Sequence, residues 1–335
     1  MNKLIRHVMI LAAAGVALAG CGKNELIRME NTLTDEIRFN NGYIDNLTRG
    51  TSLLSDHMST MGVWAWYKPK DKTEECLFKD QCVDYDQKEG RWTYSPPKYW
   101  EKNCTYVFCA YAPHSSESDG TKVTVDRATR HFNISSVTLK GDNTMEGLRQ
   151  EAPLGRFNNV DDNDWMIDRT GQDILEANGR EVEFSMQHIL SKICVLAHLD
   201  EFAGTITIDS LKIGPFIGKA DFTQKSDETA EWTLDSTAAR YWTVSEKNIT
   251  VTEPLCVLES LIFPQASSDE QMLEIHYSIG GAAFLYTHNL KDIFENGFRT
   301  AHNYVITLTI GPEIIKFDGS AVEWEDENQI HRYIQ

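Results

Sequence analysis

From residue 60 onward, hydrophobic and polar residues alternate in short segments along most of the chain. β-Branched and aromatic residues fill the hydrophobic positions, and Gly, Pro, Asn or Asp interrupt the alternation about every 8 to 15 residues. A period of two residues is typical of half-buried strands, so the pattern predicts an all-β sandwich or barrel. The clearest segments are Met61–Tyr67, Tyr106–Tyr111, Thr121–Val125, Val182–Met186, Ile206–Ile208 and Tyr304–Ile310.

One hairpin and two short helices can also be placed by pattern. Residues 273–286 alternate on both sides of Gly280-Gly281, where a positive φ carries no penalty, so we expect a hairpin that turns at these two glycines. Gln187–Leu196 and Leu290–Phe294 are the only stretches that compete as helices.

Four regions are expected along the chain. Residues 1–21 form a signal segment, and residues 22–49 form a polar tether in which the alternation at Ile37 and Phe39 predicts one removable strand. The roughly 310 residues after the signal exceed the usual domain of about 100 to 200 residues, which favours two domains. Gly, Asn and Asp crowd residues 141–180, so we expect one sandwich over residues 50–180 and another over residues 181–335.

The first residues have the features of a lipoprotein secretion signal. Lys3 and Arg6 precede a short apolar run, which ends in Leu18-Ala19-Gly20-Cys21. The run is shorter than the about 20 apolar residues that a membrane-spanning helix needs, which argues against a retained helix. The end resembles the lipobox of bacterial lipoproteins. This resemblance implies that Cys21 becomes the first residue and carries acyl chains such as palmitate, which would anchor the protein in a membrane.

Charge and motifs argue against several functions. The formal net charge is −18, and removal of Lys3 and Arg6 with the signal leaves −20. Nucleic-acid binding depends on clustered Lys and Arg, so nucleic acid is not an expected partner. The chain has no nucleophile elbow, phosphate-binding Gly-rich loop or HExxH motif, so we expect no catalytic residues and no cofactor. The acidic residues Asp161, Asp162 and Asp164 lack the spacing of a calcium loop, and we expect no metal there.

The cysteines after Cys21 leave the disulfide state open. Cys104 and Cys109 share one expected strand, where five residues of separation place them on opposite faces, so they cannot bond each other. Cys76 and Cys82 flank a polar segment that a disulfide between them could close. Buried thiols that behave as small hydrophobic groups are the better interpretation of Cys109 and Cys194. The six cysteines are Cys76, Cys82, Cys104, Cys109, Cys194 and Cys256.

Trp64 and Trp66 are the candidate ligand-binding aromatics. Two residues of separation place both rings on one face of a strand, where they could form a platform that stacks against a glycan. The alternative is that both rings belong to the core, which is the commoner role of such pairs. Exposed and coplanar rings would favour the platform.

Four segments, taken in order, resemble the fimbrillin family of Bacteroidales pilins. Trp92–Pro113 is similar to the family's Y-W followed by F-x-A-Y-x-P, and Val182–Ile193 is similar to its strand with H-x-x-[AS]-K. Leu261–Gln265 resembles its P-Q before a hairpin, and Asn303–Ile310 with the later Trp324 resembles its final strand and closing tryptophan. Together they span nearly the whole chain after the signal.

The resemblance implies a fold and a mode of assembly. It implies two tandem transthyretin-like Greek-key sandwiches in an outer-membrane lipoprotein. It also implies that a trypsin-like protease cuts after an arginine near the start and that a strand of another subunit replaces the removed one. The matching position is Arg49, before Gly50. An exposed sheet edge does accept an added strand. The alternative is that Arg49 is an ordinary solvated residue of a linker.

The C-terminus departs from the stalk pilins of this family. After Trp324 only a short acidic tail with poor alternation remains, and this tail would make a weak donor strand. The sequence therefore favours a tip, accessory or anchor subunit of cell-surface fimbriae. The expected partners are other fimbrial subunits, the outer membrane, and a glycan or protein on a host or bacterial surface. The alternative function is a surface lipoprotein that binds glycans.

Overall fold

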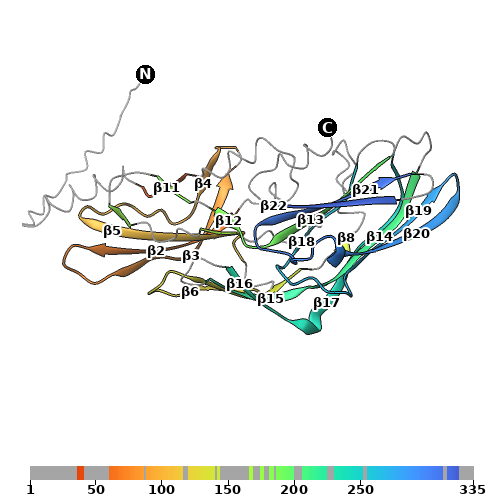
Figure 1. Cartoon of the computed structure of the whole chain (residues 1–335). Helices are drawn as coiled ribbons and strands as arrows, with labels where there is room; N and C mark the ends of the chain where they lie inside the picture. Colours follow the sequence, from red (N-terminus) through yellow and green to blue (C-terminus); the bar gives the residue numbers. More distant parts are fainter. Residues whose placement is uncertain are drawn as a thin grey trace, which may run out of the picture.

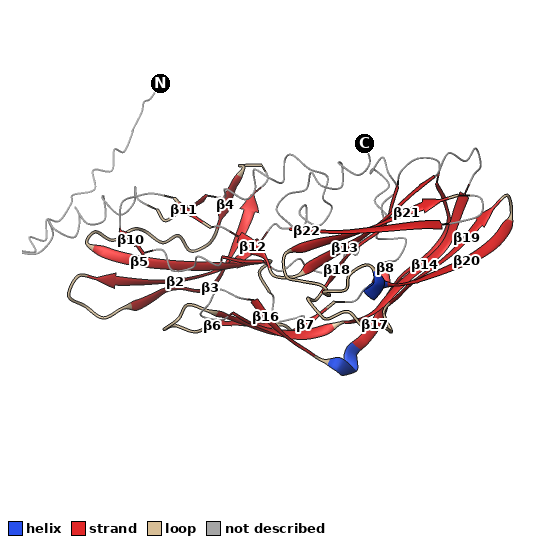
Figure 2. Ribbon diagram, viewed as in Figure 1, coloured by secondary structure: helices blue, strands red, loops and turns tan. Residues whose placement is uncertain are grey.

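Strands form nearly all of the secondary structure in the part of the chain that the structure describes (Figures 1 and 2). The structure is a computed structural model, and it describes residues 36–40, 60–86, 88–115, 120–139, 142–143, 166–168, 174–176, 181–184, 186–199, 206–224, 230–251, 255–311 and 315–323. The helices of these residues are two 3₁₀ turns, η5 (Ser236–Ala238) and η6 (Leu290–Asp292). The predicted all-β class is confirmed.

Strands between Thr60 and His188 build a seven-stranded sheet. Its strand order is β12-β9-β5-β2-β3-β4, and β10 also pairs with β5. The bounds are β2 (Thr60–Pro69), β3 (Glu75–Asp86), β4 (Arg91–Thr93), β5 (Cys104–Ala112), β9 (Met166–Asp168), β10 (Ile174–Glu176) and β12 (Met186–His188). Beside it, β1 (Phe39–Asn40) pairs in parallel with β11 (Val182–Glu183).

Three further sheets complete the fold. A four-stranded sheet has the order β18-β13-β21-β22, and a five-stranded sheet has the order β20-β19-β14-β17-β8. The bounds are β8 (Asp142–Asn143), β13 (Ser191–Leu199), β14 (Ile206–Ile217), β17 (Ala239–Val251), β18 (Leu255–Ile262), β19 (Met272–Ile279), β20 (Ala282–Asn289), β21 (His302–Ile310) and β22 (Ile315–Glu323). The last sheet, β16-β15-β7-β6, contains β6 (Lys122–Val125), β7 (Phe132–Thr138), β15 (Lys219–Gln224) and β16 (Ala230–Leu234).

The β15–β16 hairpin connects the two halves of the chain. After β14 the chain passes through Gly218 into β15, which pairs with β7, and it returns through β16 and η5 to β17 (Figure 1). A sheet therefore joins residues 122–138 to residues 219–234. The expected domain boundary near residue 180 stays a prediction, as does the transthyretin-like layout, and such a boundary does not divide the sheets into two separate sets.

Two hydrophobic clusters lie on opposite faces of β5. Tyr106, Phe108 and Ala110 belong to the smaller cluster, together with residues of β1 to β4 and β11. Cys109 and Tyr111 point the other way, into the larger cluster, which includes residues of all three remaining sheets. Alternate residues of β5 therefore belong to two different hydrophobic clusters, since both faces of the strand are covered.

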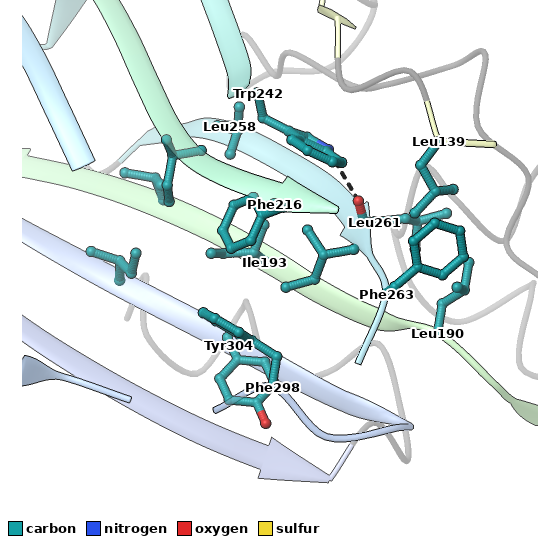
Figure 3. Packing of buried hydrophobic residues seen from close by; sticks show 14 of the residues in the cluster. Leu139, Leu190, Ile193, Phe216, Trp242, Leu258, Leu261, Phe263, Phe298 and Tyr304 are labelled. Atoms are coloured by element: carbon teal, nitrogen blue, oxygen red, sulfur yellow. Dashed lines mark hydrogen bonds between the residues drawn. The ribbon is translucent and has the colours of Figure 1, made fainter. Parts of the chain in front are cut away.

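Trp242 is one of the largest fully buried side chains of the larger cluster. It is fully buried, its Nε1 donates to the Leu261 carbonyl at 3.1 Å, and Phe216 packs edge-on against it with ring centroids 5.2 Å apart (Figure 3). Figure 3 shows Phe298 and Tyr304 on the opposite side of this packing. A buried indole needs a partner for its N–H, and the Leu261 carbonyl supplies it.

The local predictions have different outcomes. The hairpin is confirmed, because β19 and β20 pair in register and φ is +56° at Gly280 and +85° at Gly281. The helix expected at Gln187–Leu196 is wrong, since this stretch lies in β12 and β13. The short helix at Leu290–Phe294 is confirmed only in its first turn, η6.

The cysteine geometry is also clear. Cys104 and Cys109 lie in different clusters on opposite faces of β5, as expected. The idea that Cys76 and Cys82 close a loop is wrong, because both lie in the single strand β3. Six residues of extended chain span about 20 Å, so these two thiols cannot meet.

We predict that Trp242→Phe lowers the free energy of unfolding by about 2–3 kcal/mol, because it removes the donor to Leu261 and leaves part of the indole volume empty. Chemical denaturation measures this change. Tyr241→Phe is the matched control, since Tyr241 is 40% exposed and keeps its ring, and it should change stability by less than about 0.5 kcal/mol. Equal effects of the two substitutions would contradict the central role of Trp242.

Candidate functional site

Residues 36–40 lie between two segments that are distant in the sequence. The Ile37 N–H donates to the Lys98 carbonyl at 2.9 Å, and the Val182 N–H donates to the Arg38 carbonyl at 2.7 Å. Glu36 and Tyr99 form an antiparallel bridge, whereas Phe39 and Val182 pair in parallel. We call residues 36–40 and their surroundings at Tyr94, Lys98, Val182 and Phe184 the β1 site. Of the strand expected around Ile37 and Phe39, the structure contains β1 at Phe39–Asn40, and Ile37 lies just before it; that the strand is removable stays a prediction.

Two apolar side chains anchor this segment in the smaller cluster. Ile37 is fully buried and Phe39 is 5% exposed, while Arg38 between them points to solvent. The Phe39 ring stacks on Phe184 at 5.8 Å and meets Tyr94 edge-on at 5.5 Å. It also approaches Phe78 at 5.9 Å and Phe108 at 6.3 Å. Phe39 thus fills a position that aromatic side chains surround.

Tyr94 adds a polar contact inside this aromatic setting. Its hydroxyl donates to the Ile37 carbonyl at 2.7 Å, and the Lys98 N–H donates to the same hydroxyl at 3.3 Å. Burial raises the pKa of Tyr94 to about 12. The hydroxyl therefore keeps its proton at neutral pH and stays a donor.

The contacts of residues 36–40 are confined to a short stretch of chain. Burial of Ile37 and Phe39 contributes about 1.5–3 kcal/mol each, and each hydrogen bond of the segment contributes about 0.5–1.5 kcal/mol. Ordering the backbone costs about 1–2 kcal/mol per residue and offsets much of this gain. The pairing of β1 with β11 extends over two residues only.

The tryptophan pair has the expected coplanarity but not the expected exposure. The Trp64 and Trp66 rings stack with centroids 6.2 Å apart and an angle of 19° between their planes. Trp66 is only 3% exposed, because the Arg130 guanidinium carbon lies 4.3 Å from its ring centroid and Glu74 holds Arg130 at 2.6 Å. An open platform of two rings is therefore absent, and Trp64 alone is partly exposed.

Trp64 lines a pocket of about 680 Å³ between the seven-stranded sheet and β6. A bulge in the pairing of β2 with β3 places both Lys79 and Asp80 beside Trp64, and Asp80 adopts a positive φ of 50°. Thr121 and Thr124 line the opposite side. The Trp64 Nε1 atom is buried and makes no hydrogen bond to a described residue. One aromatic wall and several polar groups thus converge on the pocket.

Asp80 is fixed by side chains from β5 and the residues that follow it. The Tyr111 hydroxyl donates to Asp80 Oδ1 at 2.6 Å, and His114 Nε2 lies 3.6 Å from the same oxygen. Gly62 leaves room for this tyrosine, because a Cβ there would lie 2.2 Å from Tyr111 Cε1. Burial and the hydrogen bond from Tyr111 to Asp80 raise the pKa of Tyr111 well above its usual range, so Tyr111 remains a donor.

Several residues expected to be functional lie outside the described part of the chain. These are Cys21, Arg49, Gly50 and the acidic residues Asp161, Asp162 and Asp164. Within the described residues, His, Cys, Asp and Glu form no group of three that could hold a metal ion. A helix long and apolar enough to cross a membrane is likewise not found among them.

The fimbrillin-like family model matches residues 55–324. The chain belongs to the fimbrillin-like family. The expected resemblance is thus confirmed over more than half of the sequence. A comparison with curated protein sequences gives no match.

Solved structures with low sequence identity share the fold of this fimbrillin-like chain. A fimbrial protein from Bacteroides vulgatus is 14% identical with a TM-score of 0.56, over 86% of this chain and 99% of that one. A protein assigned to cell adhesion in Bacteroides uniformis is 13% identical with a TM-score of 0.51, over 86% of this chain and 98% of that one. At these identities the likeness concerns the fold.

Sequence reasoning missed the partners of the β1 strand. Tyr94 and Lys98 lie in the segment quoted for the family resemblance, but no pattern assigned them contacts with residues almost 60 positions earlier. Val182 and Phe184 were read as part of a strand in the second sandwich, yet they pack on Phe39 in the first. Pairing between short strands so far apart leaves no local signal.

We predict that Phe39→Ala detaches residues 36–40, because it removes the larger of the two side chains that anchor them and costs about 3–5 kcal/mol. Hydrogen exchange at the Ile37 and Val182 amides should then approach the unprotected rate. Arg38→Ala is the control, since this side chain is 59% exposed and both amides should stay protected. Retained protection in the Phe39→Ala chain would show that the phenyl ring does not hold the segment.

Proposed function

We propose that this fimbrillin-like chain is a structural or adhesive subunit of cell-surface fimbriae that assembles by strand exchange at the β1 site. The observation that carries the proposal is the geometry of residues 36–40. They complete a hydrophobic cluster through Ile37 and Phe39, yet the pairing of β1 with β11 extends over two residues only. An element that is needed for burial but weakly held suits replacement by another strand.

Cleavage after Arg49 would begin this exchange. Loss of residues 22–49 would uncover the aromatic side chains of Phe78, Phe108 and Phe184 and leave the Val182 N–H and the Lys98 carbonyl without their present partners. Exposed apolar side chains beside unpaired backbone groups favour the addition of a strand from a second subunit. The main-chain bonds would give affinity, and the position of Phe39 would select a large apolar side chain.

Membrane attachment through Cys21 fits the same proposal. A diacylglyceryl group on Cys21 would place the precursor in the outer membrane, and cleavage after Arg49 would release the chain from that anchor for assembly. The proposed mechanism is assembly, and it needs neither catalytic residues nor a cofactor.

We predict that chains sheared from the cell surface begin at Gly50, as measured by mass spectrometry of the N-terminal peptide. Arg49→Ala should keep the chain in the membrane fraction with a lipidated Cys21, because the expected cut is lost. Arg28→Ala is the matched control, since it changes an arginine in the same tether and should leave the Gly50 start intact. Surface chains that retain residues 36–40, or that start at Met29, would refute cleavage at Arg49.

Glycan binding at the Trp64 pocket is the second candidate function. Trp64 provides a ring face, and the bulge at Lys79 and Asp80 brings a cation and a carboxylate beside it. Stacking on an aromatic ring together with hydrogen bonds to convergent polar groups suits a hydroxylated ligand. The observation favours a site at Trp64 alone, since Arg130 covers Trp66.

We predict that the purified chain binds glycans on an array and that Trp64→Ala lowers this binding at least tenfold through loss of the ring face. Tyr241→Ala is the control, because it removes another partly exposed aromatic side chain outside the pocket and should leave binding unchanged. The Trp64 pocket would be excluded if both variants bound glycans as well as the unaltered chain does, or if both lost binding to the same extent.

A further inference from the structure

Cys194 and Cys256 face each other across two neighbouring strands. Cys194 lies in β13 and Cys256 in β18, and these strands pair in antiparallel register with Leu196 opposite Cys256. The pairing shifts between Val195 and Leu196, and this bulge brings the two cysteines to the same face. Their Sγ atoms are 3.3 Å apart. A disulfide requires about 2.05 Å between the sulfurs, so the bond would need the two side chains to rotate toward each other.

The remaining cysteines are not placed to compete for these two. Cys76 and Cys82 lie at separate positions along β3, and Cys104 and Cys109 lie on opposite faces of β5. Cys194 and Cys256 instead form a small cluster of their own with Leu196 and Val305. Geometry therefore favours this one pair among the six thiols.

We propose that Cys194 and Cys256 are a redox modification site that becomes a cross-strand disulfide when the chain folds outside the cytoplasm. The inference rests on the proposed export of the chain, because disulfides form and persist in oxidising compartments. The oxidant would be a protein disulfide of a thiol–disulfide oxidoreductase. One cysteine thiolate attacks that disulfide and forms a mixed disulfide, and the second thiolate displaces the oxidant as a dithiol. The oxidant gains two electrons, and the two thiol protons are released to water or to the leaving thiolates.

The environment sets when this reaction takes place. Both side chains are fully buried in the folded chain. The contact with Cys256 and burial raise the pKa of Cys194 well above its usual range, so little thiolate exists after folding. Since the thiolate is the reactive form, oxidation must occur before the face is covered, and the finished bond would then be shielded from reductants.

The position of the pair gives the bond a mechanical role. Cys194 and Cys256 are 62 residues apart, and the strands β14, β15, β16 and β17 all lie between them in sequence. A bond here would join the two ends of the stretch that supplies β14 and β17 of the five-stranded sheet and the β15–β16 hairpin. It would hold β13 to β18 when a fibre is pulled, and it lies away from the β1 site.

The test is a disulfide map of the full chain refolded in a glutathione redox buffer, alkylated, digested and measured by mass spectrometry. We expect a Cys194–Cys256 crosslinked peptide and a melting temperature that falls by about 6 °C on reduction, as for a loop of this length in a chain of this size. Alkylation of both thiols after oxidative refolding would overturn the proposal, as would a bond from either one to another cysteine.

Two variants and one native sample complete the test. Cys194→Ala/Cys256→Ala should lose the response to reductant, whereas Cys104→Ala/Cys109→Ala should keep it. If a variant fails to fold, the disulfide map of the unaltered chain still decides. Chains taken from the cell surface should carry the same crosslink. A crosslink in the refolded chain that is missing from the cell-derived chain would count against the proposed export, and its absence from both would refute the disulfide site.

Discussion

The aromatic cluster around Phe108 is the constraint on which the first part of this fold depends. Phe108 meets Phe39, Phe78, Trp100 and Tyr106 with ring centroids between 5.8 and 6.3 Å apart. β2, β3 and β5 supply most of this cluster, yet these strands leave one position open to water. Residues 36–40 cover that position, so the burial of a large apolar group depends on an element held by few contacts. A large buried side chain on so short an element favours exchange of the covering strand for another strand.

The two candidate sites lie on opposite faces of the same sheet. Phe108 and its neighbours face β1, whereas Trp64 and Trp66 pack with the larger cluster on the other side of β2. Tyr111, which orients Asp80, belongs to that second face as well. A new strand at the β1 site would therefore not cover the Trp64 pocket. Assembly and ligand binding could take place in one molecule, because the alternation of β2 and β5 separates them.

The sequence predicted what alternation and turn chemistry determine locally. It located a short strand at Phe39 and the turn at Gly280-Gly281, since both depend on neighbouring residues. It failed at Gln187–Leu196, because β13 is buried on both faces and therefore shows no alternation that would distinguish it from a helix. It also missed the cover of Arg130 over Trp66 and the pairing of β15 with β7. Those contacts join segments that are far apart in the sequence, so no periodic pattern of residues indicates them.

Exchange at one end of a molecule requires that the rest stay folded, and the β13–β18 pair has the properties of a region that does. Every residue of β18 is buried, and Lys192 and Glu259 form an ion pair at 3.1 Å with exposures of 2% and 0%. Removal of either partner leaves an uncompensated buried charge, and so does a shift of register that separates the two. The pair therefore opposes a shift of register more strongly than it stabilises the fold. β1, in contrast, pairs over two residues only. Local opening favours elements with short pairing over extended buried ones, so β1 can open while the β13–β18 pair stays folded.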